Sequence, residues 1–246
     1  ELQQLHRSVQ ALIRLVDELA DAKASNMSQE LARVRKSYQD FATALETVSE
    51  SVLGSKPLSV TGPWAPLLLR FRYYICGLFS WGVLTEKTVA EVSHELNRLG
   101  AEGLLDPLAG TGWHAYLFEE VGGLRVIALD SADVKVVGAV TWSDVKLVPD
   151  SRTAWAKETP DVSRWALFLS WPPHSPETIG EDLLRSWPGH VLIYVGEGAD
   201  DEDMGLTGGC SLLECIDCNW EAVKSWQILR WPGFRDNLII YQRRKK

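Results

Sequence analysis

The sequence lacks any long apolar segment and contains little cysteine. No stretch approaches the roughly 18 to 20 consecutive apolar residues that a transmembrane helix needs, and the N-terminus shows no basic, apolar and small-residue succession typical of a secretion signal. Only 4 cysteines occur in 246 residues, which is typical of free thiols in a reducing compartment. We therefore expect an intracellular location and no association with a membrane.

Basic residues are also in deficit. The 25 lysines and arginines face 33 acidic residues, which gives a formal net charge of −8. This charge argues against a surface built mainly to hold phosphate backbones, although a local basic patch can still bind nucleic acid. The basic tail Arg243-Arg244-Lys245-Lys246 is interpreted as a solvated terminus, with a nucleic-acid contact as the alternative.

Tryptophan and proline are absent from residues 1–55, whereas all 11 tryptophans and all 11 prolines follow. Apolar residues recur there every three or four positions, which predicts two amphipathic helices that form a helical hairpin. The first series is Leu5, Val9, Leu12, Val16 and Leu19, and the second is Leu31, Val34, Tyr38, Phe41, Leu45, Val48 and Val52. The hairpin is interpreted as a lid or as an interface for a protein partner or for self-association. The remaining residues, 56–246, form the second predicted domain.

Short apolar runs alternate with helical or loop segments beyond residue 103. They lie at 104–105, 124–129, 145–148, 165–170, 191–195 and 237–241. This alternation predicts an α/β fold with a mostly parallel sheet. Two further strands, near 225–229 and 237–241, are separated by a connection too short for a crossover, so we expect a C-terminal antiparallel hairpin. Thr85 is the expected N-cap of a helix that precedes the first run.

A glycine turn follows the first apolar run. Asp106 ends that run, Gly110 and Gly112 form the turn, and the second apolar run ends in Asp130. A strand, a glycine turn, a helix and a second strand that ends in an acidic residue form a unit typical of sites for adenosine-bearing cofactors. The glycines let the backbone approach the ligand, and the carboxylate after the second strand accepts hydrogen bonds from ribose hydroxyls. The alternative is a Rossmann-like turn without a ligand.

The spacing D-x-x-x-G-x-G resembles motif I of class I S-adenosylmethionine-dependent methyltransferases. Leu108 stands where the first glycine of that motif usually falls. The resemblance implies a Rossmann-like methyltransferase fold and S-adenosylmethionine as the cofactor. The cofactor-binding residues that it implies are Asp106, Leu108, Gly110, Gly112, Asp130 and Asp150.

A second motif, Ser170-Trp171-Pro172-Pro173-His174, ends the fourth apolar run. Ligands bind at the carboxyl ends of strands in open α/β sheets. The motif resembles motif IV of amino-group methyltransferases, in which a polar side chain and a backbone carbonyl accept hydrogen bonds from the target amino group while an aromatic ring stacks on the base. The resemblance implies Ser170, Pro172, Pro173 and His174 as catalytic residues, with His174 in place of the usual aromatic residue. The alternative is a proline-stiffened loop that ends a buried strand.

The resemblance covers about residues 72–244 and implies a methyltransferase that acts on an amino group of a nucleic-acid base or of another planar acceptor. Two alternatives stay open. One is a catalytically silent methyltransferase-like subunit that serves as a scaffold or assembly component, and the other is an enzyme that uses the same fold with a nucleotide cofactor. The methyl acceptor cannot be read from the sequence.

Three cysteines lie close together as Cys210-x4-Cys215-x2-Cys218. A structural zinc site needs four ligands, usually in two separated pairs, so we expect no metal and interpret this segment as an amphipathic helix with cysteines on its apolar face. The absence of a G-x-S-x-G motif disfavours a Ser-His-Asp hydrolase.

Overall fold

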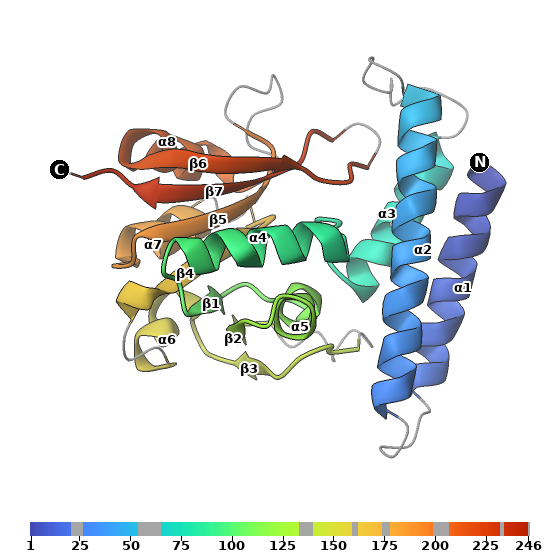
Figure 1. The fold of residues 1–246 in the computed structure, drawn as a ribbon, viewed down its shortest axis with the longest axis horizontal. Coiled ribbons are helices and arrows are strands. Elements are labelled where there is room, and N and C mark those ends of the chain that lie inside the picture. Colours follow the sequence, from blue (N-terminus) through green and yellow to red (C-terminus); the bar gives the residue numbers. More distant parts are fainter. Residues whose placement is uncertain are drawn as a thin grey trace. The chain divides into compact units, whose positions relative to one another are not determined.

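The computed structural model describes residues 1–20, 27–53, 65–132, 140–158, 162–173, 178–198, 207–231 and 234–245 (Figure 1). The chain divides into two compact units, one formed by Glu1–Leu78 with Leu229–Phe234 and the other by Phe79–Ile228 with Arg235–Lys246. Across the described residues, no helix combines the length and apolar character needed to span a membrane.

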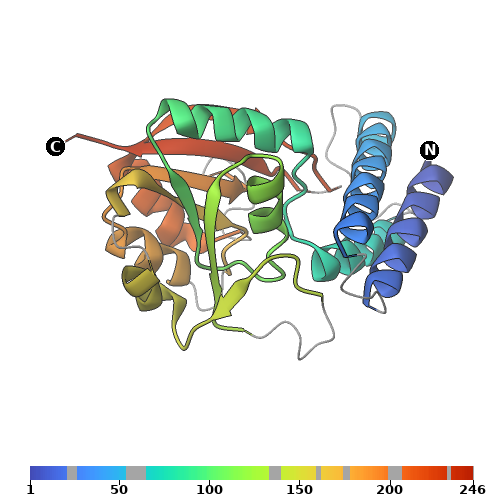
Figure 2. The same cartoon turned by 60° about the horizontal axis from the view of Figure 1, so that its bottom comes forward.

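The first unit contains the predicted helical hairpin. Helices α1 (Leu2–Ala20) and α2 (Met27–Leu53) lie side by side (Figures 1 and 2). Most members of the predicted apolar series are buried, and Leu5, Leu12, Phe41 and Leu45 are fully buried; Leu31 is half-buried, and the side chain of Val52 lies outside the described residues. Burial of one apolar stripe on each helix stabilises this pair, because apolar surface is removed from water.

Two further segments complete this unit. Helix α3 (Ala65–Leu78) contains Arg72, whose guanidinium lies 3.9 Å from the ring centroid of Phe234. The ring of Trp231 lies 5.7 Å from that of Phe41, and Ser49 Oγ donates a 3.1 Å hydrogen bond to the carbonyl of Arg230. The segment Leu229–Phe234, which is distant in sequence, therefore packs with the helices.

The second unit contains a mixed β-sheet. Its described strands are β1 (Gly103–Asp106), β2 (Arg125–Asp130), β3 (Val145–Leu147), β4 (Trp165–Ser170), β5 (Val191–Gly196), β6 (Trp220–Gln227) and β7 (Asn237–Arg243), in the order β3-β2-β1-β4-β5-β7-β6. The pairs from β3 to β5 are parallel, whereas β7 is antiparallel to both β5 and β6. The predicted α/β fold with a C-terminal antiparallel pair is confirmed.

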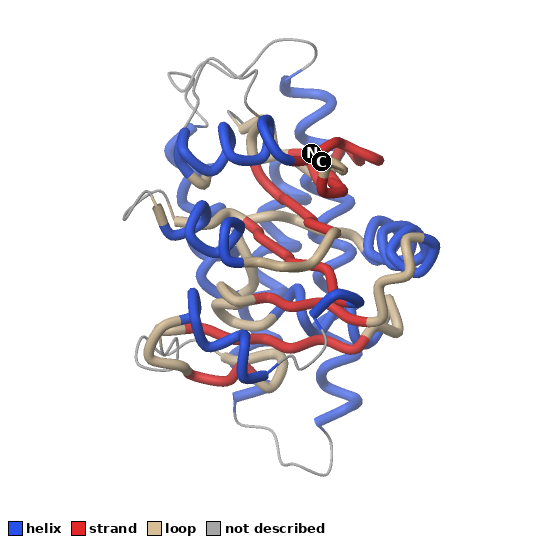
Figure 3. Tube along the Cα trace, turned by 90° about the vertical axis from the view of Figure 1, so that its left-hand side faces the viewer, coloured by secondary structure: helices blue, strands red, loops and turns tan. Residues whose placement is uncertain are grey.

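Helices cover both faces of this sheet (Figure 3). They are α4 (Glu86–Arg98) and α5 (Trp113–Glu120) on one face, and α6 (Ser151–Glu158), α7 (Ile179–Ser186) and α8 (Gly209–Asn219) on the other; a short 3-10 helix, Val162–Arg164, precedes β4. The core under α6 to α8 contains Leu105, Leu167, Leu192, Leu183 and Leu212. Because both faces are covered, the parallel strands are almost wholly apolar.

Strand β6 differs from the sequence prediction. It begins at Trp220 rather than near Ser225 and ends at Gln227. Glu221 and Lys224 are exposed, because β6 is an edge strand with one solvated face. Alternation of polar and apolar residues, and not an apolar run, marks such a strand.

The predicted cap of α4 is confirmed. Thr85 Oγ1 accepts a 3.1 Å hydrogen bond from the backbone N–H of Thr88. We expect Thr85→Ala to lower the free energy of unfolding by about 1 kcal/mol, because an orphan N–H at the helix start loses its partner. Urea denaturation measures this loss, and Thr85→Ser is the matched control that keeps the hydroxyl. Equal stability of Thr85→Ala and wild type would contradict the capping role.

Candidate functional site

Asp106 ends β1 and is buried beneath the turn that follows. Its Oδ1 accepts a 3.3 Å hydrogen bond from the N–H of Leu108. Burial, with a smaller contribution from the charge of Asp130, raises the pKa of Asp106 to about 8, although the bond from Leu108 acts in the opposite direction. Burial therefore favours the neutral form of the Asp106 side chain.

Asp130 ends the neighbouring strand β2 and holds the glycine turn. Its Oδ2 accepts a 2.7 Å hydrogen bond from the N–H of Gly110, and its Oδ1 accepts a 2.8 Å bond from the N–H of Ala132. A second link joins the same strand and turn, because the N–H of Ala109 donates to the carbonyl of Leu129 at 3.0 Å. Each carboxylate oxygen keeps acceptor capacity beyond these bonds.

The two glycines of the turn serve different purposes. Both have a positive φ, 54° at Gly110 and 77° at Gly112. A Cβ at Gly112 would collide with Ser143 Oγ and would lie 2.7 Å from a methyl of Val145, whereas a Cβ at Gly110 would meet no described atom within 4 Å. Gly112 is therefore required by packing within the protein, whereas Gly110 faces open space beside Asp130.

Of the two residues that contact Gly112, Val145 begins β3 and Ser143 belongs to the segment before it. The N–H of Trp142 donates a 2.8 Å hydrogen bond to the carbonyl of Thr111. The ring of Trp142 stacks on Phe79 at 4.9 Å and meets the edge of Trp113 at 5.0 Å. This aromatic cluster fixes the segment against the glycine turn.

Leu108 does not obstruct the turn although it replaces a usual glycine. Its side chain is half-buried and packs against the apolar core that includes Leu105 and Leu129. The larger residue is therefore accommodated on the core side of the turn.

Ser170 and the residues after it lie at the end of β4, which pairs with β1. Ser170 is half-buried, and Trp171 adopts a φ of 48° with its N–H bound to the carbonyl of Val195 at 2.9 Å. The carbonyl of Pro172 accepts a 3.0 Å hydrogen bond from Gly208, and Pro173 is exposed. His174 lies outside the described residues.

Sequence reasoning missed a segment that crosses the ends of β4 and β5. A Cβ at Gly82 would lie 2.8 Å from a methyl of Val195 and 3.4 Å from Ser170 Oγ. Nε2 of the buried His114 lies 3.0 Å from the carbonyl of Gly82, and burial lowers the pKa of His114 to about 4. A neutral His114 therefore donates to this carbonyl and holds the segment over Ser170. Only the shape of the fold brings these positions together.

Asp150 lies at the start of α6. Its Oδ1 accepts from the backbone N–H of Arg152 at 3.0 Å and from the Nε of the same residue at 2.9 Å. These bonds lower the pKa of Asp150. The carboxylate thus caps α6, and its contact with a cofactor stays a prediction.

The three clustered cysteines lie on α8, and the predicted helix is confirmed. Cys215 is buried with Leu212 and Ile216, and Cys210 is half-buried, whereas Cys218 is exposed, so its predicted place on the apolar face is wrong. All four cysteines are free. Among the described residues, no group of three or more His, Cys, Asp or Glu side chains is placed to hold a metal ion.

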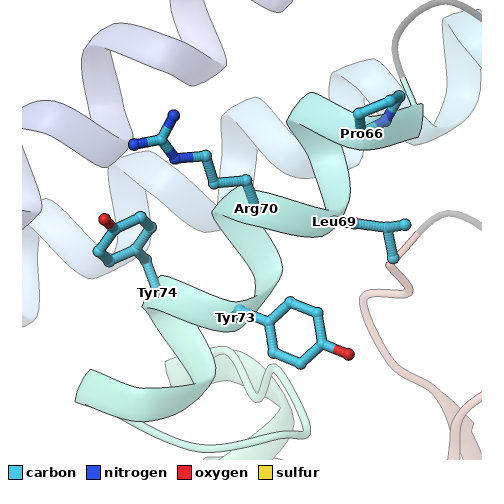
Figure 4. A pocket seen from close by; sticks show the side chains of 5 residues that line it. All are labelled: Pro66, Leu69, Arg70, Tyr73 and Tyr74. Atoms are coloured by element: carbon cyan, nitrogen blue, oxygen red, sulfur yellow. The ribbon is translucent and has the colours of Figure 1, made fainter.

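A shallow hollow of about 570 Å³ lies on α3 of the first unit (Figure 4). Its lining residues are Pro66, Leu69, Arg70, Tyr73 and Tyr74. The guanidinium of Arg70 lies 5.8 Å from the ring centroid of Tyr74, and both tyrosines are exposed. This hollow contains none of the predicted site residues.

Comparison with known proteins yields likenesses of structure alone. No protein-family model and no curated protein matches the chain. It is similar to an O-methyltransferase from Bacillus cereus solved with SAH, at 12% identity, a TM-score of 0.46 and coverage of 83% of this chain and 99% of that one. It is also similar to the N-methyltransferase NodS from Bradyrhizobium japonicum, solved with S-adenosyl-L-homocysteine, at 10% identity, a TM-score of 0.38 and coverage of 83% of this chain and 98% of that one. For TrmN from Thermus thermophilus the identity is 15%, the TM-score is 0.41, and the coverage is 71% of this chain and 53% of that one.

The sheet itself carries the assignment of the fold. A parallel sheet that ends in an antiparallel pair is the arrangement implied by the resemblance of the sequence. The described strands form the Rossmann-like α/β sheet with a C-terminal antiparallel pair that the sequence predicts.

Proposed function

We propose that the second unit binds S-adenosylmethionine and transfers its methyl group to an acceptor held near Ser170. The observation that carries the proposal is the open space beside Gly110, at the carboxyl end of β1 and against the carboxylate of Asp130. The donor set fits the cofactor, since Asp130 keeps acceptor capacity for ribose hydroxyls. Asp106 lies beneath the same turn, and a cationic amino group nearby would favour its ionised form.

The residues of this chain would act mainly by positioning. The cofactor, when bound, supplies an electrophilic methyl group. Ser170 Oγ would accept a hydrogen bond from the acceptor's amino group, and the segment at Gly82 would exclude water from the ends of β4 and β5. Positioning and desolvation supply much of the rate in such group transfers. A planar acceptor, such as a nucleic-acid base, is the class that the motif at Ser170 favours.

Two observations favour a second candidate, a silent scaffold subunit. The segment at Trp142 and Ser143 packs directly on the glycine turn, and the carbonyl of Pro172 is already bonded to Gly208. In that case the helical hairpin of the first unit would carry the role of the protein, as an interface for a partner or a second copy.

Calorimetric titration of the full chain with S-adenosylhomocysteine separates the two candidates. We expect binding by wild type and roughly ten- to hundredfold weaker binding by Asp130→Asn, because charge-assisted hydrogen bonds to the ribose are lost. Asp182→Asn, which removes the same charge from a partly exposed side chain on α7, is the matched control and should bind like wild type. A folded wild type that binds nothing at millimolar ligand would overturn the enzyme and favour the scaffold.

A further inference from the structure

A second groove lies at the amino edge of the sheet, opposite the candidate site. It has a volume of about 360 Å³ and runs between the end of α4, the starts of β4 and β5, and the end of β7. Figure 3 looks toward this side of the molecule. The strands separate the groove from Ser170 by the length of β4, about 20 Å for six residues.

The groove collects positive charge on a chain whose net charge is −8. Its charged or titratable lining residues are Arg164, His190, Arg243 and Lys245, and no acidic side chain lines it among the described residues. The acidic neighbour Glu102 forms an ion pair with the exposed Arg164. The lining therefore has a net positive charge even when this pair is counted as neutral.

The arginines of the basic tail are bonded to the protein, whereas Arg244 and Lys245 remain exposed, as the interpretation of a solvated terminus predicts. The Nε of Arg243 donates to the carbonyl of Gly189 at 3.2 Å, and the guanidinium stacks 4.5 Å from the ring centroid of Trp220. The Nε of Arg244 donates to the carbonyl of Trp220 at 2.9 Å. Sequence reasoning missed this because the partners of the tail lie about 20 to 55 residues earlier in the chain.

Positive charge also continues past the groove. Arg125, at the start of β2, lies with its guanidinium 5.3 Å from the ring centroid of Trp165, which lines the groove floor. Arg244 extends the row at the end of β7. The cations thus form a track along the amino ends of β2, β4 and β5 and the carboxyl end of the antiparallel β7.

We propose that this amino-edge groove binds the phosphate backbone of a single-stranded nucleic acid. Arginine and lysine side chains recognise phosphate oxygens through charge-assisted hydrogen bonds. A volume near 360 Å³ is at the lower end of small-ligand sites and admits about one nucleotide, and the flanking arginines continue along the strand.

Fluorescence anisotropy with a labelled oligouridylate of about 12 nucleotides tests the proposal. We expect wild type to bind with an affinity that falls as salt rises. Arg164→Gln combined with Lys245→Gln should lower the affinity about tenfold at low salt and reduce the log–log salt slope by about 1.4, or 0.7 for each lost contact. Both side chains are exposed, so the variant should keep the melting temperature of wild type.

The matched control is Lys36→Gln combined with Lys87→Gln, which removes two exposed charges elsewhere. It should bind like wild type. An equal loss in the control, or a wild type that does not bind the oligouridylate, would overturn the proposal. Competition by poly-glutamate as effective as that by unlabelled oligouridylate would also overturn it, in favour of an acidic peptide. Because the groove lies at the other edge of the sheet, saturating S-adenosylhomocysteine should leave the anisotropy titration unchanged. The test of the groove is therefore independent of cofactor binding.

Discussion

Gly112→Ala should lower the free energy of unfolding by about 2–5 kcal/mol, whereas Gly110→Ala should lower it by only about 1–2 kcal/mol. Both residues have a positive φ, which costs a residue with a Cβ about 1–2 kcal/mol. Only at Gly112 does the new methyl also collide with Ser143 and Val145, and such overpacking adds about 1–3 kcal/mol. Urea denaturation of the two variants measures the difference.

A double variant tests the cause of this difference. Gly112→Ala combined with Ser143→Gly removes the hydroxymethyl group that the new Cβ would strike, and it should recover part of the lost stability. Gly110→Ala should remain folded and should bind S-adenosylhomocysteine more weakly, because its methyl fills the space left for a ligand. Equal destabilisation by the two single alanine variants would refute the assignment of separate roles to the glycines.

The stability of wild type should fall as pH rises from 6.5 to 8, and Asp106→Asn should remove that fall. The pKa of Asp106 is raised from 3.8 to about 8 by burial. In this window the folded chain therefore keeps a proton that the unfolded chain has released. The free energy of unfolding then decreases with pH by up to about 1.4 kcal/mol per unit, or about 1.6 kcal/mol across the window, because the slope falls by half as pH reaches the folded pKa.

His114 acts in the opposite direction in the lower part of this window. Its pKa is lowered from 6.5 to about 4, so the unfolded chain still binds part of a proton at pH 6.5, and stability rises slightly as this proton is lost. The contribution is the same in wild type and Asp106→Asn, and it cancels when the two curves are compared. Asparagine keeps an acceptor for the N–H of Leu108, which makes Asp106→Asn a conservative change. Urea denaturation at pH 6.5, 7.2 and 8 measures both curves. Parallel curves for wild type and variant would show that Asp106 is already ionised in the folded chain.

Local patterns predicted those features that depend on neighbours in sequence. The apolar series of the hairpin, the parallel strands and the cap at Thr85 all follow from spacing within one element. The glycine turn between Asp106 and Asp130 was predicted for the same reason, because both carboxylates end apolar runs. The structure also shows that Asp130 holds the turn itself, because its carboxylate accepts a hydrogen bond from the N–H of Gly110.

The rest depended on contacts between distant segments. The need for glycine at 112 arises from Ser143, and the position of the segment at Gly82 depends on His114. The anchoring of Arg243 depends on carbonyls near Gly189. None of these pairings has a periodic signature, since packing and not propensity selects them.

The position of β7 between β5 and β6 has a consequence for synthesis on the ribosome. Although β6 is made first, it has no partner in the sheet until residues 237–243 emerge, because it pairs with β7 and not with β5. Until then the row of backbone N–H and C=O groups along β5 is an open edge able to pair with another chain. Premature termination before β7 would thus leave a nascent polypeptide with two unpartnered edges, a natural substrate for chaperones or for aggregation.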